Sequence, residues 1–388
     1  MKIKIFSIFH GRFPSEKAAS LFAAKGAEAF AKIGIEVTLL VPRRIWRKRT
    51  DPYEYYNLEK NFKIVYLPTL DFFTVPLIRK IAFPISFLVF SFLCLLFLLF
   101  KAKKEDIVYS NESLPILFST LYFPNTLYEL HDFPEGSKFF YKRLFKRVRH
   151  LLVTNKWKAE KVVREFNVSD KKIILERSAV DIKEFDIPIK KAEARKKLGL
   201  PIEKKIAVYT GHLYSWKGAD ILAEAAKAIP EILVVFVGGT GPDIKRFKAL
   251  FGSIGNIILA GYKDHAEVPY WQKAADVLIL PNTAKEDISK FYTSPMKLFE
   301  YMASKRPIVA TDIPSIREIL NSENAIIIPP DDIDGLVSGI KKSLDSQELV
   351  NKVTVHAYRD VLNHTWEKRA KRIFDFLEKQ GTFNGATI

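Results

Sequence analysis

Short apolar runs and longer amphipathic segments alternate along the 388-residue chain. Short apolar runs are typical of strands buried in a parallel sheet, and apolar residues three and four positions apart are typical of helices packed on it. The expected strands are 2–9, 36–41, 106–109, 126–130, 151–153, 173–175, 204–210, 234–237, 257–261, 277–280, 308–310 and 325–329. The clearest helices are 17–33, 138–149, 156–166 and 365–378. This alternation predicts an α/β protein with parallel sheets.

The length leaves room for two domains, at roughly 150 residues each. The Lys-rich stretch 186–200 is the best linker, so we expect a first domain over 1–186 and a second from 187 onward. A hydrophobic content of 48% supports folded cores. The single cysteine, Cys94, excludes an intrachain disulfide and fits a reducing compartment. The first residues are too short an apolar run for a signal peptide.

The stretch 293–311 predicts a helix followed by a buried strand. Pro295 suits the first turn of a helix, where its missing N–H leaves no hydrogen bond unmade, and Thr293 or Ser294 can cap that turn. A loop that leads into a helix N-terminus presents free N–H groups to a phosphate. Glu300 follows between one and two turns later, where a carboxylate can accept hydrogen bonds from sugar hydroxyls. The alternative is an ordinary helix–strand unit with an exposed glutamate.

The run SPMKLFEYMA at 294–303 resembles the donor-binding signature of glycosyltransferase family 4, whose members are retaining enzymes of the GT-B fold that use nucleotide sugars. The family pattern has two glutamates separated by seven residues. Glu300 matches the second, which in the family binds the nucleotide ribose, and Tyr292 stands at the first. A phenol does not accept from two sugar hydroxyls as a carboxylate does, so the sugar contact departs from the family.

Residues 211–218, GHLYSWKG, resemble the family loop that grips the donor diphosphate with an arginine and a lysine. Lys217 matches the lysine, and His212 replaces the arginine with a group only partly charged near neutral pH. A surface lysine after a turn is the alternative for Lys217. The resemblance implies further donor contacts at Gly211, Thr293, Ser294, Met296 and Lys297, and at Tyr262 on the side of the base. Lys297 would act mainly through its backbone N–H.

The first domain carries two acceptor-side elements. Residues 129–132, Glu-Leu-His-Asp, resemble the family's Glu-x-His-Asp/Glu element, which places His131 close to the reacting sugar. Asp132 is a candidate to orient the ring or take the acceptor proton, and a structural histidine is the alternative for His131. The carboxyl end of a parallel strand is the expected place for such contacts. The loop with Gly11 and Arg12 resembles the family loop beside the acceptor. The alternative is an ordinary turn between a strand and a helix.

The resemblance therefore implies a GT-B fold, with two Rossmann-like domains, a cleft between them and a C-terminal helix that crosses back to the first domain. The first domain would be completed by about 365–388, which leaves 187–364 for the donor. The implied function is a retaining hexosyltransferase that moves a sugar from a nucleoside diphosphate to an acceptor hydroxyl. Nothing in the sequence demands a cofactor or a metal. The aspartates at 331–334 read instead as a helix N-terminus.

A net charge of +17 indicates an anionic partner, and no motif for nucleic-acid binding supports that class. Two basic segments, 43–49 and 138–149, lie in the first domain. The second has the composition of an interfacial helix, apolar on one side and cationic on the other. A helix docked on the sheet with a charged outer face is the alternative. We expect the first domain to meet an anionic membrane surface.

Residues 81–100 carry no charge and are long enough to span a membrane. The chain then continues directly into a strand of the same predicted sheet, so we expect a packed helix whose outer face meets lipid. The protein would be cytoplasmic and peripheral at the inner face of the cell membrane, with a lipid-linked or glycan acceptor. The second hypothesis is a membrane-associated GT-B-fold binding or scaffold protein without transferase activity, because Tyr292 and His212 both depart from the donor site.

Overall fold

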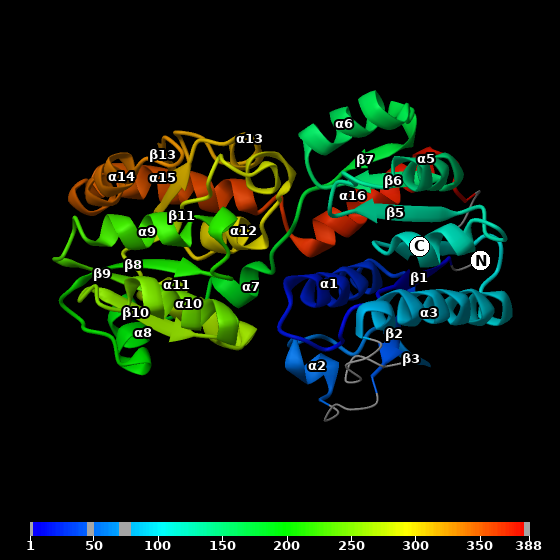
Figure 1. Ribbon diagram of the computed structural model, residues 1–388, viewed down its shortest axis with the longest axis horizontal. Coiled ribbons are helices and arrows are strands. Elements are labelled where there is room, and N and C mark those ends of the chain that lie inside the picture. Colours follow the sequence, from blue (N-terminus) through cyan, green and yellow to red (C-terminus); the bar gives the residue numbers. More distant parts are fainter. Residues whose placement is uncertain (1–2, 45–49, 70–78, 384–388) are drawn as a thin grey trace. The chain divides into compact units, whose positions relative to one another are not determined.

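The computed structural model describes residues 3–44, 50–69 and 79–383 (Figure 1). The chain divides into two compact units. The first contains Met1–Glu176 and Trp366–Ile388, and the second contains Arg177–Thr365. The division falls at Glu176, earlier in the chain than the predicted boundary after residue 186, and the C-terminal segment joins the first unit from Trp366 onward, one residue after the predicted position.

The first unit is built on a seven-stranded parallel sheet with the order β3-β2-β1-β4-β5-β6-β7. Each predicted strand of this region lies in it. The strands are β1 (Lys4–Ile8), β2 (Glu36–Arg43), β3 (Lys63–Pro68), β4 (Ile107–Ser110), β5 (Thr126–Leu130), β6 (His150–Val153) and β7 (Ile173–Leu175). The helices are α1 (Ala18–Lys32), α2 (Pro52–Tyr55), α3 (Arg79–Lys101), α4 (Ser113–Ser119), α5 (Lys138–Arg147), α6 (Lys156–Phe166) and α16 (Trp366–Lys379).

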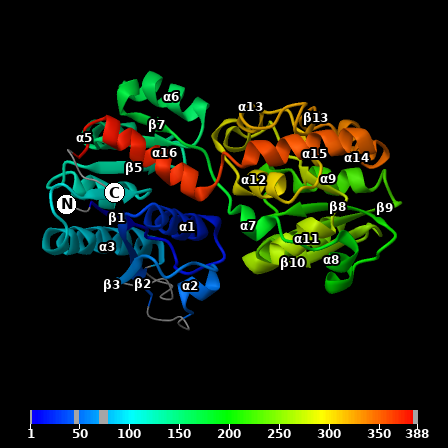
Figure 2. The ribbon, with the colours of Figure 1, turned by 180° about the vertical axis from the view of Figure 1, so that it is seen from behind.

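The C-terminal helix α16 is held in the first unit by two arginine–carboxylate pairs. It lies beside α1 (Figure 2). Arg372 donates two hydrogen bonds to Glu176, of 2.7 and 2.8 Å. Arg369 is buried and donates to the buried Glu129 of β5 at 2.6 Å. Paired charges of this kind tolerate burial where single charges do not.

Helix α3 packs on the sheet with one face and exposes apolar side chains on the other. It contacts α4 and β3. Its buried residues include Phe90, Cys94 and Leu98. Its exposed residues are Ile81, Phe83, Ile85, Leu88, Phe92, Leu99 and Phe100. Among the described residues it is the one helix long and apolar enough to cross a membrane, and a third of that stretch is buried. Because β3 and β4, on either side of it in the chain, belong to one sheet, α3 is a packed helix of this unit.

Helix α5 is a docked helix with a charged outer face, one of the two alternatives that its sequence left open. Leu144 and Phe145 are buried against the unit, so the helix is docked. Its outer side carries a cluster of exposed cations: Lys142, Arg143, Lys146 and Arg147. Of the other basic segment, 43–49, Arg43 and Arg44 are described and 45–49 lie outside the described residues.

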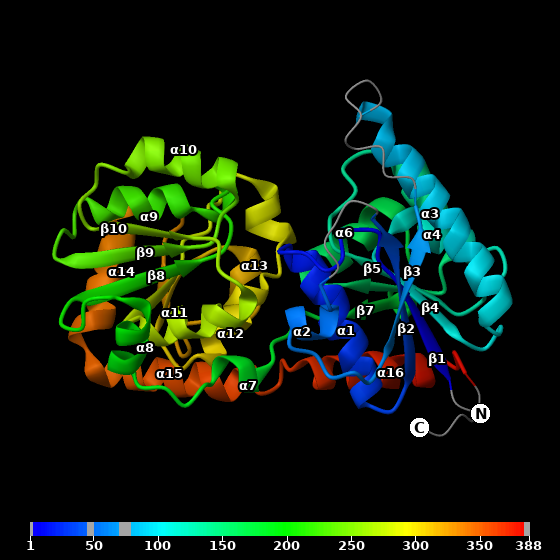
Figure 3. The ribbon, with the colours of Figure 1, turned by 90° about the horizontal axis from the view of Figure 1, so that it is seen from below.

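The second unit contains a six-stranded parallel sheet with the order β10-β9-β8-β11-β12-β13 (Figure 3). The strands are β8 (Lys205–Thr210), β9 (Ile232–Val237), β10 (Ile257–Gly261), β11 (Val277–Leu280), β12 (Ile308–Thr311) and β13 (Ile326–Ile328). The helices are α7 (Ile182–Phe185), α8 (Lys191–Leu198), α9 (Ala219–Ala226), α10 (Gly241–Phe251), α11 (Val268–Ala274), α12 (Met296–Ala303), α13 (Pro314–Arg317), α14 (Ile333–Asp345) and α15 (Gln347–Val361).

Both faces of the second sheet are buried, which explains the uninterrupted apolar runs in its strands. Side chains alternate along β8: Ile206 and Val208 enter one core, and Ala207 and Tyr209 enter the other. Helices α8, α11, α12 and α15 supply the first core, and α9, α10 and α14 supply the second. The carboxyl ends of β8, β9 and β10 therefore emerge as neighbours from a rigid base.

The stretch 186–200, which the sequence suggested as the linker, lies within the second unit. It contains α8, and α8 packs against α11. Arg195 is buried there, pairs with Asp276 at 2.6 Å and donates to the Ala274 carbonyl at 2.9 Å. The lysines of this stretch cover the solvent side of a docked helix, and such composition resembles that of a linker.

Candidate active site

Glycines with positive φ line the carboxyl ends of three adjacent strands in the second unit. Gly211 follows β8 with φ 123° and donates from its N–H to the Val237 carbonyl at 2.8 Å. Gly238 follows β9 with φ 119°, and a Cβ there would lie 2.5 Å from the Gly211 carbonyl oxygen. Both positions therefore require glycine, and the backbone at this edge is open to close approach by a ligand.

Two lysines converge on the same edge. Lys297 of α12 donates from Nζ to the Thr210 carbonyl at 3.1 Å, and its ammonium lies 3.8 Å from the centre of the Tyr209 ring. Lys217 comes from the loop after β8, where its ammonium lies 5.0 Å from the centre of the Trp216 ring. Within the described part of the chain, no carboxylate lies at ion-pair distance from either ammonium. The edge is thus electropositive.

The electrostatics of the two lysines follow from burial and from each other. Burial lowers the pKa of Lys217 to about 8, and the Asp243 carboxylate opposes that shift in part. Burial and then the charge of Lys217 lower the pKa of Lys297 well below its usual value. In the unfolded chain Lys217 binds a proton up to about pH 10.5, so folded-state stability rises with pH between about 8 and 10.5. At neutral pH the folded protein therefore holds a buried ammonium at a cost in stability, and a bound anion would reduce that cost.

Helix α12 begins one residue later than predicted. Pro295 has extended backbone angles, φ −73° and ψ 127°, and is the N-cap, so the first helical residue is Met296. No side chain caps this end. The Ser294 hydroxyl instead accepts from the Ser178 N–H at 3.2 Å, and the Ser294 carbonyl accepts from the Ser178 hydroxyl at 2.6 Å. The Leu298 N–H of the first turn donates to the Pro295 carbonyl at 3.1 Å, so a ligand at this end would meet the N–H groups of Met296 and Lys297.

Tyr301 fixes α12 against the end of β8. Its buried phenol oxygen accepts from the Thr210 N–H at 2.8 Å and lies 3.1 Å from the Thr210 hydroxyl. Burial raises the pKa of Tyr301, so the phenol stays neutral. This contact sets the position of Lys297 and of Glu300, which precede Tyr301 on the helix.

Glu300 is buried on α12, and the Nε2 atom of His265 lies 3.8 Å from its carboxylate. Tyr292 is also buried and ends a π-helical turn over Ile288–Tyr292. Tyr262 follows β10, is 46% exposed and donates to Asp264 at 3.1 Å. Thr293 and Met296 are half-buried beside them.

His212 does not occupy the loop as a free cation. Its ring stacks on Tyr214 at 5.0 Å with an angle of 6° between the planes. Its Nδ1 atom lies 4.0 Å from Asp243 Oδ2. Its carbonyl accepts from Tyr209 at 2.6 Å, which fixes the loop.

The first unit places His131 at the carboxyl end of β5, as predicted. Its Nε2 atom lies 3.2 Å from Glu129 Oε1, and its ring meets the edge of Phe22 at 4.7 Å between centres. Burial opposes ionisation of Glu129, but the charges of Arg369 and His131 outweigh it, and the pKa of Glu129 falls to about 2. Tyr109 also donates to this carboxylate. Glu129 is therefore an ionised, fixed partner for one nitrogen of His131.

The loop after β5 is held by a buried lysine. Lys158 of α6 donates to the carbonyls of Leu130 and His131 and to the Thr154 hydroxyl. Asp132, next in the chain, is exposed.

Arg12, in the loop after β1, pairs with Glu16 at 2.5 Å. Gly11 packs under Phe9, whose ring a Cβ would meet at 2.3 Å.

Sequence reasoning missed Tyr301, His265, Lys158 and the Arg369–Glu129 pair. Glu129 and Tyr301 lie within the two motifs, so their spacing was visible although their roles were not. Arg369 comes from a helix 240 positions away in the chain, and no local pattern connects it to β5.

Residues 204–346 match a family model described as "Glycosyl transferases group 1". These residues include the glycine edge, both lysines and Glu300. The lipopolysaccharide core biosynthesis mannosyltransferase LpsB of Rhizobium meliloti is 27% identical over 209 residues, which cover 50% of this chain and 57% of that protein. The chain spans about half the length of the first curated relatives it matches.

An Escherichia coli UDP-Gal:alpha-D-GlcNAc-diphosphoundecaprenol alpha-1,3-galactosyltransferase is 25% identical over 66% of this chain and 70% of its own length. The solved structure of Anabaena Alr3699/HepE in complex with UDP and glucose has a TM-score of 0.74 at 14% identity, covering 97% of this chain and 99% of that one. That likeness extends through both units and shows the fold. The chain thus has the GT-B fold, and the part of its second unit at 204–346 matches the group 1 glycosyltransferases.

Proposed function

We propose that the chain transfers a sugar from a nucleoside diphosphate sugar to an acceptor hydroxyl. The observation that carries this proposal is the pair Lys217 and Lys297, whose ammonium groups repel each other at the end of β8 and have no carboxylate at ion-pair distance among the described residues. A diphosphate supplies the negative charge that such a site lacks. The positive end of the α12 dipole adds to the attraction. The solved structure of Anabaena Alr3699/HepE is a complex with UDP and glucose, which supports a nucleotide as the ligand of this fold.

Each group of the second unit has a role in this reaction. Lys217 and Lys297 stabilise the negative charge that develops on the diphosphate as its bond to the anomeric carbon breaks. Glu300 accepts from the ribose hydroxyls, and Tyr262 lies on the base side. His212 adds a further positive charge when protonated. Because these cations are preorganised, we propose that no metal and no cofactor is required.

The first unit supplies the acceptor side. The acceptor oxygen bonds to the anomeric carbon, and its proton passes to a base, for which Asp132 is the proposed group. Glu129 orients the His131 ring, and His131 stabilises the reacting sugar. Retention of anomeric configuration and transfer of a hexose are proposed from the family resemblance. The acceptor is a lipid-linked sugar or a glycan, which agrees with the diphosphoundecaprenol-linked sugar in the name of one relative and with lipopolysaccharide core biosynthesis in the name of another.

A screen of UDP- and GDP-sugars tests the donor. A donor present at a hundred times its dissociation constant should stabilise the protein by about 2.7 kcal/mol, visible as a rise in Tm. Slow donor hydrolysis should accompany it in the presence of EDTA. Lys227→Ala, an exposed lysine of the same unit, is the matched control and should behave as the wild type. No stabilisation and no hydrolysis with any donor would favour the scaffold protein that Tyr292 and His212 suggest.

We further propose that the first unit docks on the cytoplasmic face of the cell membrane. The exposed apolar face of α3 and the four outward cations of α5 support this. Each basic residue near an anionic surface contributes about 1 kcal/mol, screened over a Debye length of about 8 Å. Apolar insertion by α3 supplies a part that salt does not remove.

Vesicle co-sedimentation tests the docking. Binding should rise with the fraction of anionic lipid, weaken in high salt, and be lost when Lys142, Arg143, Lys146 and Arg147 are changed to glutamate. A matched variant changes the same number of exposed lysines in the second unit, namely Lys245, Lys248, Lys341 and Lys342, and should keep most of the binding. Wild-type protein that stays in the supernatant at low salt would refute membrane docking.

A further inference from the structure

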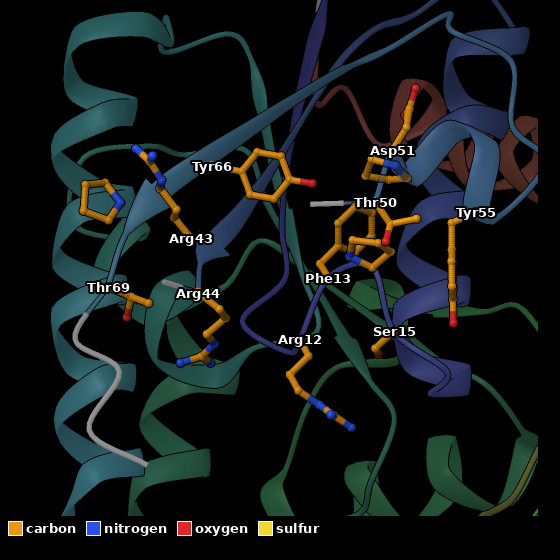
Figure 4. Close-up of a pocket in the computed structure, with 13 residues that line it drawn as sticks. Arg12, Phe13, Ser15, Arg43, Arg44, Thr50, Asp51, Tyr55, Tyr66 and Thr69 are labelled. Atoms are coloured by element: carbon orange, nitrogen blue, oxygen red, sulfur yellow. The ribbon is translucent and has the colours of Figure 1, made fainter. Parts of the chain in front are cut away.

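A cavity of about 850 Å³ opens in the first unit, at the carboxyl ends of β1, β2 and β3 (Figure 4). Its lining comes from the loop after β1, the end of β2, the start of α2 and the end of β3. It belongs entirely to the first unit and is separate from the donor residues. The lining residues used below are Arg12, Arg43, Arg44, Tyr66 and Thr69.

The charge of the lining is positive. The lining contains three arginines and one aspartate, Asp51, whose carboxylate already accepts from the Tyr53 N–H at 2.9 Å and pairs with Lys60 at 3.1 Å. One of the arginines, Arg12, is paired with Glu16 at 2.5 Å. Arg43 is exposed and has no carboxylate at ion-pair distance within the described ranges. Arginine presents planar forked donors that match phosphate oxygens, so this composition selects phosphate over a neutral ligand.

The position of Arg44 is built into the fold. Its guanidinium donates to the His10 carbonyl and to the Ser86 hydroxyl, both at 3.2 Å. Ser86 is buried on α3, and its hydroxyl also lies 3.0 Å from that of Thr69. These contacts join the cavity wall to α3. A surface arginine held in this way loses little conformational freedom when it binds a ligand.

The same helix carries the exposed apolar face described above. Phe83 and Ile85, next to Ser86 in α3, are 55% and 36% exposed. Because Arg44 and Thr69 of the wall contact Ser86, a ligand whose phosphate lies in the cavity would have the apolar face of the same helix available for a hydrocarbon chain. A sugar phosphate without such a chain would use the cavity alone.

We propose that this cavity binds the phosphate or diphosphate group of the acceptor, with Arg43, Arg44 and Arg12 on its oxygens and Tyr66 against its carbon skeleton. The inference rests on the proposed transferase function and names the chemical class of its second substrate. A phosphorylated lipid and a free sugar phosphate share this chemistry. The continuity with α3 favours the lipid.

Isothermal titration with three probes tests the site. Farnesyl diphosphate carries both features, inorganic diphosphate only the charge, and farnesol only the chain. We expect farnesyl diphosphate to bind, and Arg43→Gln and Arg44→Gln each to weaken it about tenfold, the usual effect of losing a hydrogen bond between charged groups. Arg43 is exposed, so its variant keeps the test informative if the Arg44 variant unfolds. Farnesol should bind at least about tenfold more weakly than farnesyl diphosphate.

The donor site must be excluded as the place where diphosphate binds. Lys217→Ala is the control, and it should leave farnesyl diphosphate binding unchanged. A loss of binding in that variant, equal affinity for the wild type and Arg43→Gln, or equal affinity for farnesol would each overturn the proposal. Inorganic diphosphate that binds as tightly as farnesyl diphosphate would support the cavity with a soluble phosphate as its ligand. Donor hydrolysis is measured separately, so failure of the transferase function and failure of the cavity are distinguishable.

Discussion

Replacement of Arg369 by leucine is expected to lower the free energy of unfolding of the first unit by about 3–5 kcal/mol, because it leaves Glu129 as an unpaired buried carboxylate. Arg369 and Glu129 are both fully buried, and their contact of 2.6 Å joins α16 to β5. For a unit of this size the loss corresponds to a fall in Tm of roughly 10 °C. Calorimetry and urea denaturation measure it.

The pH dependence provides an independent check. In the wild type the pKa of Glu129 is lowered to about 2, so its stabilising contribution is present above pH 4.5 and is lost as pH falls toward 2. Without Arg369 the pKa of the buried carboxyl should rise, and the variant should then lose stability as pH increases. Arg359→Leu, an exposed arginine on α15, is the control and should change stability by less than about 0.5 kcal/mol. An equally small effect at Arg369 would contradict the structural role of the pair.

Replacement of Lys217 by alanine is expected to reduce kcat/KM for the donor by about 10²–10³-fold. Lys217 is proposed as a preorganised hydrogen-bond donor to the leaving diphosphate, and removal of one such donor typically lowers the rate by about this factor. Turnover of a UDP- or GDP-sugar by chromatography measures it. A reduction in kcat/KM smaller than about fivefold would show that Lys217 does not contact the diphosphate.

The same lysine predicts a pH profile. Because the pKa of Lys217 is lowered to about 8, the free protein loses this ammonium as pH rises through 8, and kcat/KM should fall there. Lys217→Arg keeps its charge at all these pH values, so the variant should lose the fall near pH 8 even if its activity is lower. A wild-type profile that stays flat up to pH 10 would show that Lys217 does not act as a cation.

Much of the fold follows from sequence periodicity. The buried parallel strands are apolar throughout, and β7 and α6 begin and end at the predicted residues. The exceptions have physical causes. The segment 186–200 looked like a linker because α8 presents its lysines to solvent and buries Ala194 and Arg195. Pro295 looked like a first helical residue but is an extended N-cap, because Ser294 is held by Ser178.

The candidate site was predictable where its chemistry is local to a motif. The loop containing Gly211 and Lys217 and the helix containing Glu300 lie at adjacent positions of one sheet edge because both follow parallel strands. The side chain of Lys297, for which we expected mainly a backbone role, reaches the Thr210 carbonyl. That contact, like the one between Arg369 and Glu129, depends on which strands pair, and the apolar pattern does not encode strand order.

The central claim is that the second unit holds a nucleoside diphosphate between the loop after β8 and the start of α12. A crystal structure with the nucleoside diphosphate that most stabilises the protein tests it most directly. We predict diphosphate oxygens about 3 Å from the Nζ atoms of Lys217 and Lys297 and from the first N–H groups of α12, with the ribose hydroxyls on Glu300. A nucleotide bound elsewhere, or a diphosphate in contact with neither lysine, would contradict the account.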